Sequence, residues 1–390
     1  MTELFQKFFN SEKAGGLLLI ACTIISMVLA NSSAGPDFIH FWHSAAPLKI
    51  GAINIPFRIE EWINDGLMTI FFLLVGLEIE REIYTGELSS FKNAILPALA
   101  AAGGIAVPAL IHAFFNYGSP EAAGNAIPTA TDIAFSLGIL SLTGNRIPFS
   151  LKIFLTALAI MDDLGAIVII GIFYTKSFSI LFLALAVALF GVLLIFNRLK
   201  FFSLWIYLPA GVFLWYFLYR SGVHPTLSGV LLAFAIPFQQ RGKKAPSVFL
   251  QEALHMPVNF IIIPIFALAN TAIFLPSNWK IEIFSSNSLG IALGLLLGKP
   301  IGIVGFTLIA VWLGIAKLPE GFNFTKLIGV GFLAGIGFTM SIFISNLAFD
   351  SNAGLIQSSK IAVLIASLLA AVIGWMIIKT ELGKKINTLI

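Results

Sequence analysis

Long apolar stretches separated by short polar ones make up almost the whole chain. Most of them have at least about the 20 residues that a helix needs to cross a bilayer, and none shows the alternation of a half-buried strand. The pattern predicts twelve membrane-spanning helices. Their approximate ranges are 12–31, 59–80, 95–116, 122–143, 150–174, 178–197, 202–219, 223–238, 247–275, 288–314, 327–349 and 357–379.

The segment 47–57, between the first two predicted helices, has a different pattern. It alternates in part between apolar and polar residues and has Gly51-Ala52 at its centre, which predicts a β-hairpin. Because a two-stranded hairpin is only marginally stable in water, we expect it to pair with a second subunit on the outer face. A plain loop is the alternative.

The composition is that of an integral membrane protein. Apolar residues make up 58% of the chain and charged residues 11%, whereas soluble domains contain about 45–50% and about 25%. The spans lack the alternation of outer-membrane barrels, so we expect an all-α polytopic fold in a single transmembrane domain, 1–390. The single cysteine, Cys22, excludes an intramolecular disulfide and a cysteine-based metal cluster. The net charge of +4 is too small and dispersed to indicate a nucleic-acid partner.

The positions of Lys and Arg predict the orientation. Twelve spans return the chain to the side on which it starts. If both termini are cytoplasmic, 16 of the 23 Lys and Arg residues lie on the inner side and six on the outer side. This asymmetry follows the positive-inside rule.

Two adjacent carboxylates, Asp162 and Asp163, lie inside an apolar stretch. The nearest charges on either side are Lys152 and Lys176, so the pair lies close to the centre of its span. A charge at that depth costs on the order of 2.5–3.5 kcal/mol on insertion scales. Two such residues side by side indicate a functional site.

A third carboxylate, Asp132, is the only charge between Glu121 and Arg146, so it also lies at mid-membrane. Pro128 precedes it and cannot donate a hydrogen bond to a helix. The hydroxyl of Thr131 lies beside it. The pattern predicts an interrupted helix whose freed backbone groups face a polar site.

A single buried cation is predicted in the tenth span. Lys299 is the only charge between Glu282 and Lys317 and is also central. A buried ammonium needs a partner, and the three midplane carboxylates are the candidates.

The centre of span 327–349 is polar without being charged. It contains Gly335, Gly337 and Thr339, which predict a second interrupted helix, although tight packing through small residues is an alternative. Two interrupted helices in corresponding places predict a transporter with inverted-topology repeats, at approximately 95–174 and 288–379, and with its site at the midplane.

Together the midplane groups suit ion exchange. Carboxylate, hydroxyl and carbonyl oxygens bind hard cations such as Na⁺ or Li⁺, and the same carboxylates can hold protons instead. Two adjacent carboxylates with one lysine can release more than one proton per sodium, which predicts electrogenic exchange.

Three alternatives are open at this point. A buried ion-pair lattice would explain one Asp–Lys pair but not three carboxylates. An intramembrane aspartyl protease needs two facing Asp residues, but its Gly-x-Gly-Asp pattern is absent. A sodium-coupled solute symporter shares the interrupted-helix layout.

Several longer motifs resemble the NhaA-type bacterial sodium/proton antiporters, over a region from about residue 12 to the last span. The motifs are Trp62–Asp65, Phe71–Glu78, Thr131–Phe135, Ala159–Ala166, Ser221–His224 and Gly298–Pro300. The resemblance implies an inner-membrane homodimer joined through the external hairpin. It implies twelve helices, of which the two interrupted ones cross at the midplane in unwound segments. It also implies export of Na⁺ in exchange for H⁺ in pH and sodium homeostasis, with no cofactor and no enzymatic activity.

The resemblance also implies roles for the midplane residues. Asp163 matches the principal Na⁺ ligand, and Asp162 matches its neighbour, which pairs with the lysine at Lys299. Thr131 and Asp132 match residues of the unwound segment. Asp162, Asp163 and Thr131 are the predicted Na⁺ ligands.

A second group contains the candidates for a response to pH. Glu78, Glu82 and His224 match family positions tied to that response, and Glu252 and His255, at the start of span nine, are further candidates. The family often has Glu-His-x-Leu-His at the start of span nine, whereas this chain has Gln-Glu-Ala-Leu-His at 251–255. We therefore expect a pH response with a different midpoint or steepness.

Overall fold

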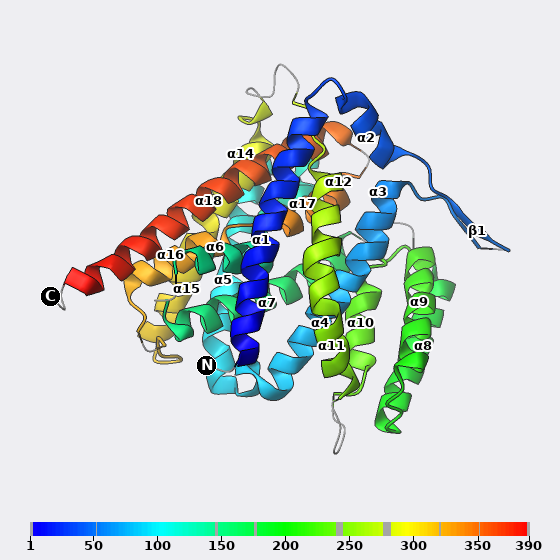
Figure 1. Cartoon of the computed structure of the whole chain (residues 1–390), viewed down its shortest axis with the longest axis horizontal. Helices are drawn as coiled ribbons and strands as arrows, with labels where there is room; N and C mark the ends of the chain where they lie inside the picture. Colours follow the sequence, from blue (N-terminus) through cyan, green and yellow to red (C-terminus); the bar gives the residue numbers. More distant parts are fainter. Residues whose placement is uncertain are drawn as a thin grey trace. The chain divides into compact units, whose positions relative to one another are not determined.

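The computed structural model describes residues 3–51, 53–144, 147–174, 178–238, 245–275, 282–319, 321–350 and 352–387. The chain is mostly helical (Figure 1). It forms two compact units, one made of 1–21, 87–166 and 273–390 and the other of 22–86 and 167–272.

Within the described residues, seven helices are long and apolar enough to cross a membrane, or nine if each of two bent helix pairs is one span. The predicted spans 122–143, 202–219 and 223–238 are not among them. The last of these contains a helix of only 9 residues, α10 (Leu227–Ala235), which is shorter than a bilayer is thick. Twelve spans therefore stay a prediction.

The first unit has a long helix, a broken helix and a second long helix, in that order, twice along the chain. The first series is α5 (Phe91–Asn116), η3 (Pro120–Thr129) with α6 (Ile133–Leu142), and α7 (Phe149–Phe173); the second is α14 (Ser286–Leu293), η5 (Gly294–Gly298) and α15 (Lys299–Trp312), then α16 (Phe324–Ala334) with α17 (Phe338–Ala348), then α18 (Ala353–Asn387). The unit also contains η2 (Glu87–Ser89) and the start of α1 (Glu3–Ala30).

Helices α5 and α15 pack backbone against backbone. A Cβ atom on Gly103 would lie 2.3 Å from the carbonyl oxygen of Gly302, and one on Gly302 would lie 2.1 Å from that of Gly103. Only residues without a side chain permit this approach, as is common between membrane helices. The contact holds Lys299, at the start of α15, beside the first helix series.

The two breaks have a local cause in the sequence. Residues 130–132 leave the helix directly after Thr129, two residues beyond Pro128, and Ala130 is extended. Gly335 and Gly337 lie in the second break, at 335–337. Pro128 lies in the last turn of η3 and Thr339 in the first turn of α17, so both lie close to the unwound residues.

The second unit packs around α4 (Met68–Thr85) and α10. Its remaining elements are the end of α1, α2 (Gly35–His43), β1 (Leu48–Ile50), β2 (Ile53–Ile55), α3 (Ile59–Glu61), η1 (Trp62–Leu67), the end of α7, α8 (Ile180–Arg198), α9 (Leu204–Ser221), α11 (Pro246–Pro257), η4 (Val258–Ile262) and α12 (Ile263–Asn270). A Cβ atom on Gly229 would lie 2.2 Å from the carbonyl oxygen of Thr69, so α4 and α10 are also in backbone contact. The helix α2 was not predicted.

The segment predicted as a hairpin contains two antiparallel strands. Leu48 is opposite Ile55, and Ile50 is opposite Ile53. Ile55 is buried and Ile50 is 62% exposed. The exposed strand β1 is the part of this segment that is accessible to a second subunit.

Candidate functional site

The two broken helices of the first unit bind each other at their breaks. The backbone N–H of Asp132 donates to the carbonyl of Ile336 at 2.6 Å. The Ser136 hydroxyl donates to the carbonyl of Leu333 at 2.8 Å. Because both carbonyls belong to the last turn of α16 or to the break after it, the unwound backbone of each helix is satisfied by the other.

Asp132 caps two helices at once. Its Oδ1 accepts from the backbone N–H of Phe135 at 2.9 Å, which caps α6. Its Oδ2 accepts from the backbone N–H of Thr339 at 3.1 Å, at the start of α17, and from the Thr339 hydroxyl. A carboxylate is the preferred group at the positive end of a helix, and here one carboxylate serves two.

Lys299 pairs with Asp162. Its Nζ lies 2.5 Å from Asp162 Oδ2, and both side chains are fully buried. The same Nζ lies 3.0 Å from the hydroxyl of Thr131. That hydroxyl lies 2.7 Å from Asp162 Oδ2 and 2.7 Å from the carbonyl of Ala334, so its single proton can go to either oxygen. Thr131 thus links the ion pair to the end of α16.

Asp163 is the neighbour of Asp162 on α7, and its side chain is buried and interacts with the charge of Lys299. Adjacent helical residues point about 100° apart, so the two carboxylates face different neighbours. The Oδ1 atom of Asp162 is buried and accepts no hydrogen bond within the described residues. It faces Gly104, where a Cβ atom would lie 3.7 Å away.

The three midplane carboxylates do not converge on one point. No group of three or more His, Cys, Asp or Glu side chains in the described part of the chain is placed to hold a metal ion. Asp132 is held by helix ends, and Asp162 and Asp163 remain as the carboxylates beside the lysine. A hard cation there would need hydroxyl and carbonyl oxygens as well, which Thr131 and the broken backbone offer.

The predicted pH-response residues all lie in the second unit, where three of them gather at one end of α4. Glu78 hydrogen-bonds the side chain of Gln251 and interacts with the charges of Arg81 and Glu82. Arg81 Nη2 lies 3.1 Å from Glu82 Oε1. The charge of Arg81 also acts on His255.

The other two predicted residues lie apart from this cluster. Glu252 is exposed on α11. His224 Nδ1 lies 2.8 Å from the Thr226 hydroxyl, and its Nε2 lies 3.4 Å from Asp65 Oδ1. Asp65 precedes Glu78 by 13 residues, which is roughly 20 Å along a helix.

Three hydroxyls that support the crossing were not predicted. Besides Ser136, the Ser341 hydroxyl donates to the carbonyl of Ile127 at 2.6 Å, and the backbone N–H of Phe338 donates to Ser367 at 3.1 Å. For Ser136 and Ser341 the only signal in the sequence is a hydroxyl within about one turn of a predicted break, and Ser367, on α18, has no such signal. That signal is weak because Ser and Thr often hydrogen-bond within their own helix.

Buried charges at the crossing of two broken helices, in a chain rich in apolar helices, are typical of a secondary active transporter. The family model for Na⁺/H⁺ antiporter 1 matches residues 6–378. The chain is 54% identical to the Na⁺/H⁺ antiporter NhaA of Dechloromonas aromatica, over 96% of this chain and 95% of that protein. It is 52% identical to the NhaA of Cytophaga hutchinsonii and 54% identical to that of Flavobacterium psychrophilum, in both cases over 99% of this chain and 98% of the relative.

The chain therefore belongs to the NhaA family of Na⁺/H⁺ antiporters, and the resemblance seen in its motifs is confirmed. It is a bacterial membrane protein and a transporter, not an enzyme, which removes the intramembrane protease from consideration.

Proposed function

We propose that this protein exports Na⁺, and also Li⁺, across the bacterial inner membrane in exchange for protons, and does so electrogenically. Family membership supports the Na⁺/H⁺ exchange. The observation that carries the site assignment is the buried group of Asp162, Lys299 and Thr131 at the crossing of the two broken helices. No cofactor is required, because Na⁺ and H⁺ are themselves the substrates.

In this proposal Asp163 is the main Na⁺ ligand, and Asp162 and Thr131 complete the site. Sodium displaces a proton from Asp163. It also attracts Asp162, which weakens the Asp162–Lys299 pair and favours release of a second proton. Because Asp162 and Lys299 are in direct contact, the second proton belongs to the pair as a unit. Asp132 takes part indirectly, by holding the ends of α6 and α17.

The wider architecture follows the same proposal. The repeated order of long, broken and long helices supports inverted repeats at approximately 95–174 and 288–379, within twelve spans and with both termini cytoplasmic. The exposed strand β1 supports dimerisation through the segment 47–57 on the outer face. The cluster of Glu78, Glu82 and His255 supports a response to pH, and the pairing of Glu78 with Gln251 is where this chain departs from the family pattern.

Proton flux in vesicles tests the site. Protein reconstituted with a pH-sensitive dye should move protons after a Na⁺ or Li⁺ pulse, and Asp163→Asn should abolish this while still inserting. Asp37→Asn, at an exposed position on α2, is the matched control and should exchange normally. Exchange by Asp163→Asn at the wild-type rate would show that the site is wrong.

The same vesicles test electrogenicity. With a voltage-sensitive dye and no other ion pathway, a Na⁺ pulse should build a membrane potential because more than one proton moves per sodium. In Asp162→Asn that potential should vanish, since the coupled second proton is lost. Exchange by the wild type without any potential would exclude this stoichiometry.

A further inference from the structure

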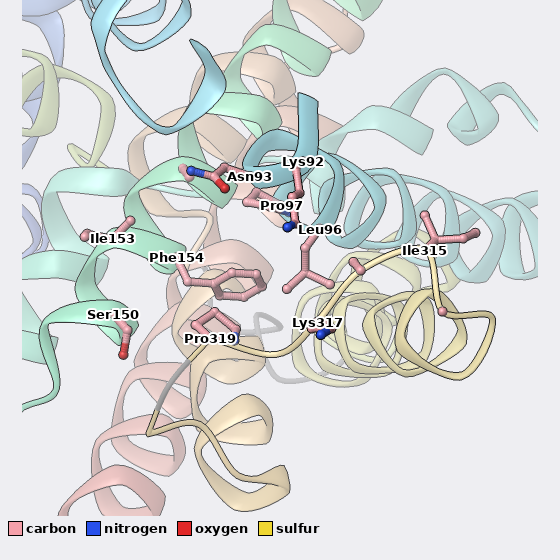
Figure 2. A pocket seen from close by; sticks show the side chains of 13 residues that line it. Lys92, Asn93, Leu96, Pro97, Ser150, Ile153, Phe154, Ile315, Lys317 and Pro319 are labelled. Atoms are coloured by element: carbon pink, nitrogen blue, oxygen red, sulfur yellow. The ribbon is translucent and has the colours of Figure 1, made fainter. Parts of the chain in front are cut away.

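A cavity of about 390 Å³ lies at the ends of three helices of the first unit (Figure 2). Lys92 and Leu96 of α5, Ser150 and Phe154 of α7, and Lys317 of the loop after α15 are among the residues that line it. Its volume is within the roughly 300–1,000 Å³ of small-molecule sites. The cavity is distinct from the crossing of the broken helices, because none of its lining residues belongs to either break.

The charge of this cavity is positive. Among the described residues that line it, Lys92 and Lys317 are the charged ones, and none is acidic. Neither lysine forms a salt bridge with another described side chain, and both are exposed. Figure 2 shows Lys92 on α5 and Lys317 on the loop after α15, on two sides of the pocket. Two lysines that line one cavity, without a carboxylate among its described lining residues, favour a ligand with negative charge.

The position of the cavity favours a lipid. Lys92 and Ser150 are second residues of α5 and α7, and Lys317 follows closely on α15; these are three of the helices able to span a membrane. Phe91 is 82% exposed and Trp312 is 83% exposed at these same helix ends. Aromatic side chains gather where a bilayer meets water. We therefore expect the cavity to lie at the depth of the headgroups.

We infer that this cavity binds the phosphate headgroup of an anionic phospholipid. Lys92 and Lys317 contact the phosphate, and the acyl chains lie along the apolar ends of α5 and α15. Basic pockets between membrane helices bind such headgroups in general. The lysines belong to the side that the positive-inside rule assigns to the cytoplasm, so the lipid comes from the inner leaflet. This inference rests on membrane insertion and is independent of the proposed exchange stoichiometry.

Lipid binding to the full-length protein in neutral detergent tests the inference. Native mass spectrometry would give the affinities for phosphatidylglycerol and phosphatidylcholine. Each lysine near an anionic lipid raises the binding affinity about fivefold. The protein with both Lys92→Gln and Lys317→Gln should therefore bind phosphatidylglycerol about 25-fold more weakly. Arginine at both positions should retain the binding. Lys200→Gln with Lys379→Gln removes the same charge from exposed positions outside the cavity and should change nothing.

Three results would overturn the inference. The first is unchanged phosphatidylglycerol binding in the Lys92→Gln, Lys317→Gln protein, whose melting temperature should match the wild type because both side chains are exposed. The second is an equal loss of phosphatidylglycerol affinity in the Lys200→Gln, Lys379→Gln control. The third is binding of inorganic phosphate as tight as that of the lipid, which would assign the cavity to a soluble phosphate.

Discussion

Replacing Asp132 should destabilise the protein in graded steps, because its carboxylate caps both α6 and α17. Asp132→Ala removes the acceptor of two backbone N–H groups and one hydroxyl. Loss of a cap costs about 0.5–2 kcal/mol, and here two caps are lost, which gives roughly 1–4 kcal/mol. The negative charge of Asp132 also attracts the positive ends of both helices, so we expect a loss of stability in the upper part of this range.

Asp132→Asn and Thr339→Val separate the contributions. Asn keeps one acceptor oxygen and turns an amide towards the other donor, so it should retain about one of the two caps. Thr339→Val removes only the hydroxyl bond, which is worth about 0.5–1.5 kcal/mol, and leaves both backbone donors satisfied. The expected order of destabilisation is Asp132→Ala, then Asp132→Asn, then Thr339→Val.

Thermal unfolding in detergent at a fixed scan rate measures this order. At roughly 2–4 °C per kcal/mol, Asp132→Ala should lower the apparent melting temperature by about 5–15 °C and Thr339→Val by about 1–6 °C. The scan rate must be held constant because membrane proteins of this size often unfold irreversibly. Equal losses for Asp132→Ala and Thr339→Val would refute the double cap.

Three further predictions address packing, assembly and pH. Gly302→Ala should destabilise by about 1–3 kcal/mol, because its Cβ would lie 2.1 Å from a backbone oxygen, whereas Gly305→Ala on the same helix meets nothing within 4 Å and should be neutral or stabilising in the same melting assay. Ile50→Ser should lower the dimer fraction in light scattering without reducing exchange, since this side chain is 62% exposed on β1; an unchanged dimer fraction would count against the hairpin interface. Glu78→Gln mimics the protonated carboxyl and should flatten the pH–activity curve in vesicles. Glu252→Gln, on the exposed face of α11, should leave the pH–activity curve unchanged.

The breaks in the helices were predictable because their cause is local. Pro128 removes a backbone donor, and Asp132 at mid-span is too costly to leave against lipid. Depth alone did not predict the partner of Lys299, because three carboxylates were equal candidates, and only the family resemblance pointed to Asp162. Lys299 pairs with Asp162 because the contact between α5 and α15 holds the lysine beside it. Asp132 is engaged elsewhere, because at the crossing its carboxylate accepts a hydrogen bond from the start of α17.

Other features needed the three-dimensional structure for different reasons. The nine-residue helix α2 is too short for the search for bilayer-length apolar stretches. The segment 47–57 was predicted as a unit available to a partner, yet Ile55 and Phe57 are buried in their own unit. Deleting the whole segment would therefore damage the fold. A substitution in the exposed strand β1 tests assembly without this damage.

The position of Thr131 suggests how binding and movement are coupled in the proposed exchange. Its hydroxyl has one proton and two acceptors, Asp162 at the ion pair and the carbonyl of Ala334 at the end of α16. A cation bound to Asp162 and to the Thr131 oxygen would repel that proton from the carboxylate and direct it to Ala334. Loading the site with Na⁺ would then strengthen the contact between the broken helices, while protonation of Asp162 would leave the hydroxyl free to turn. On this reasoning the Thr131→Val protein should lose the difference in thermal stability between Na⁺-loaded and proton-loaded states, even where Asp163 still binds the ion.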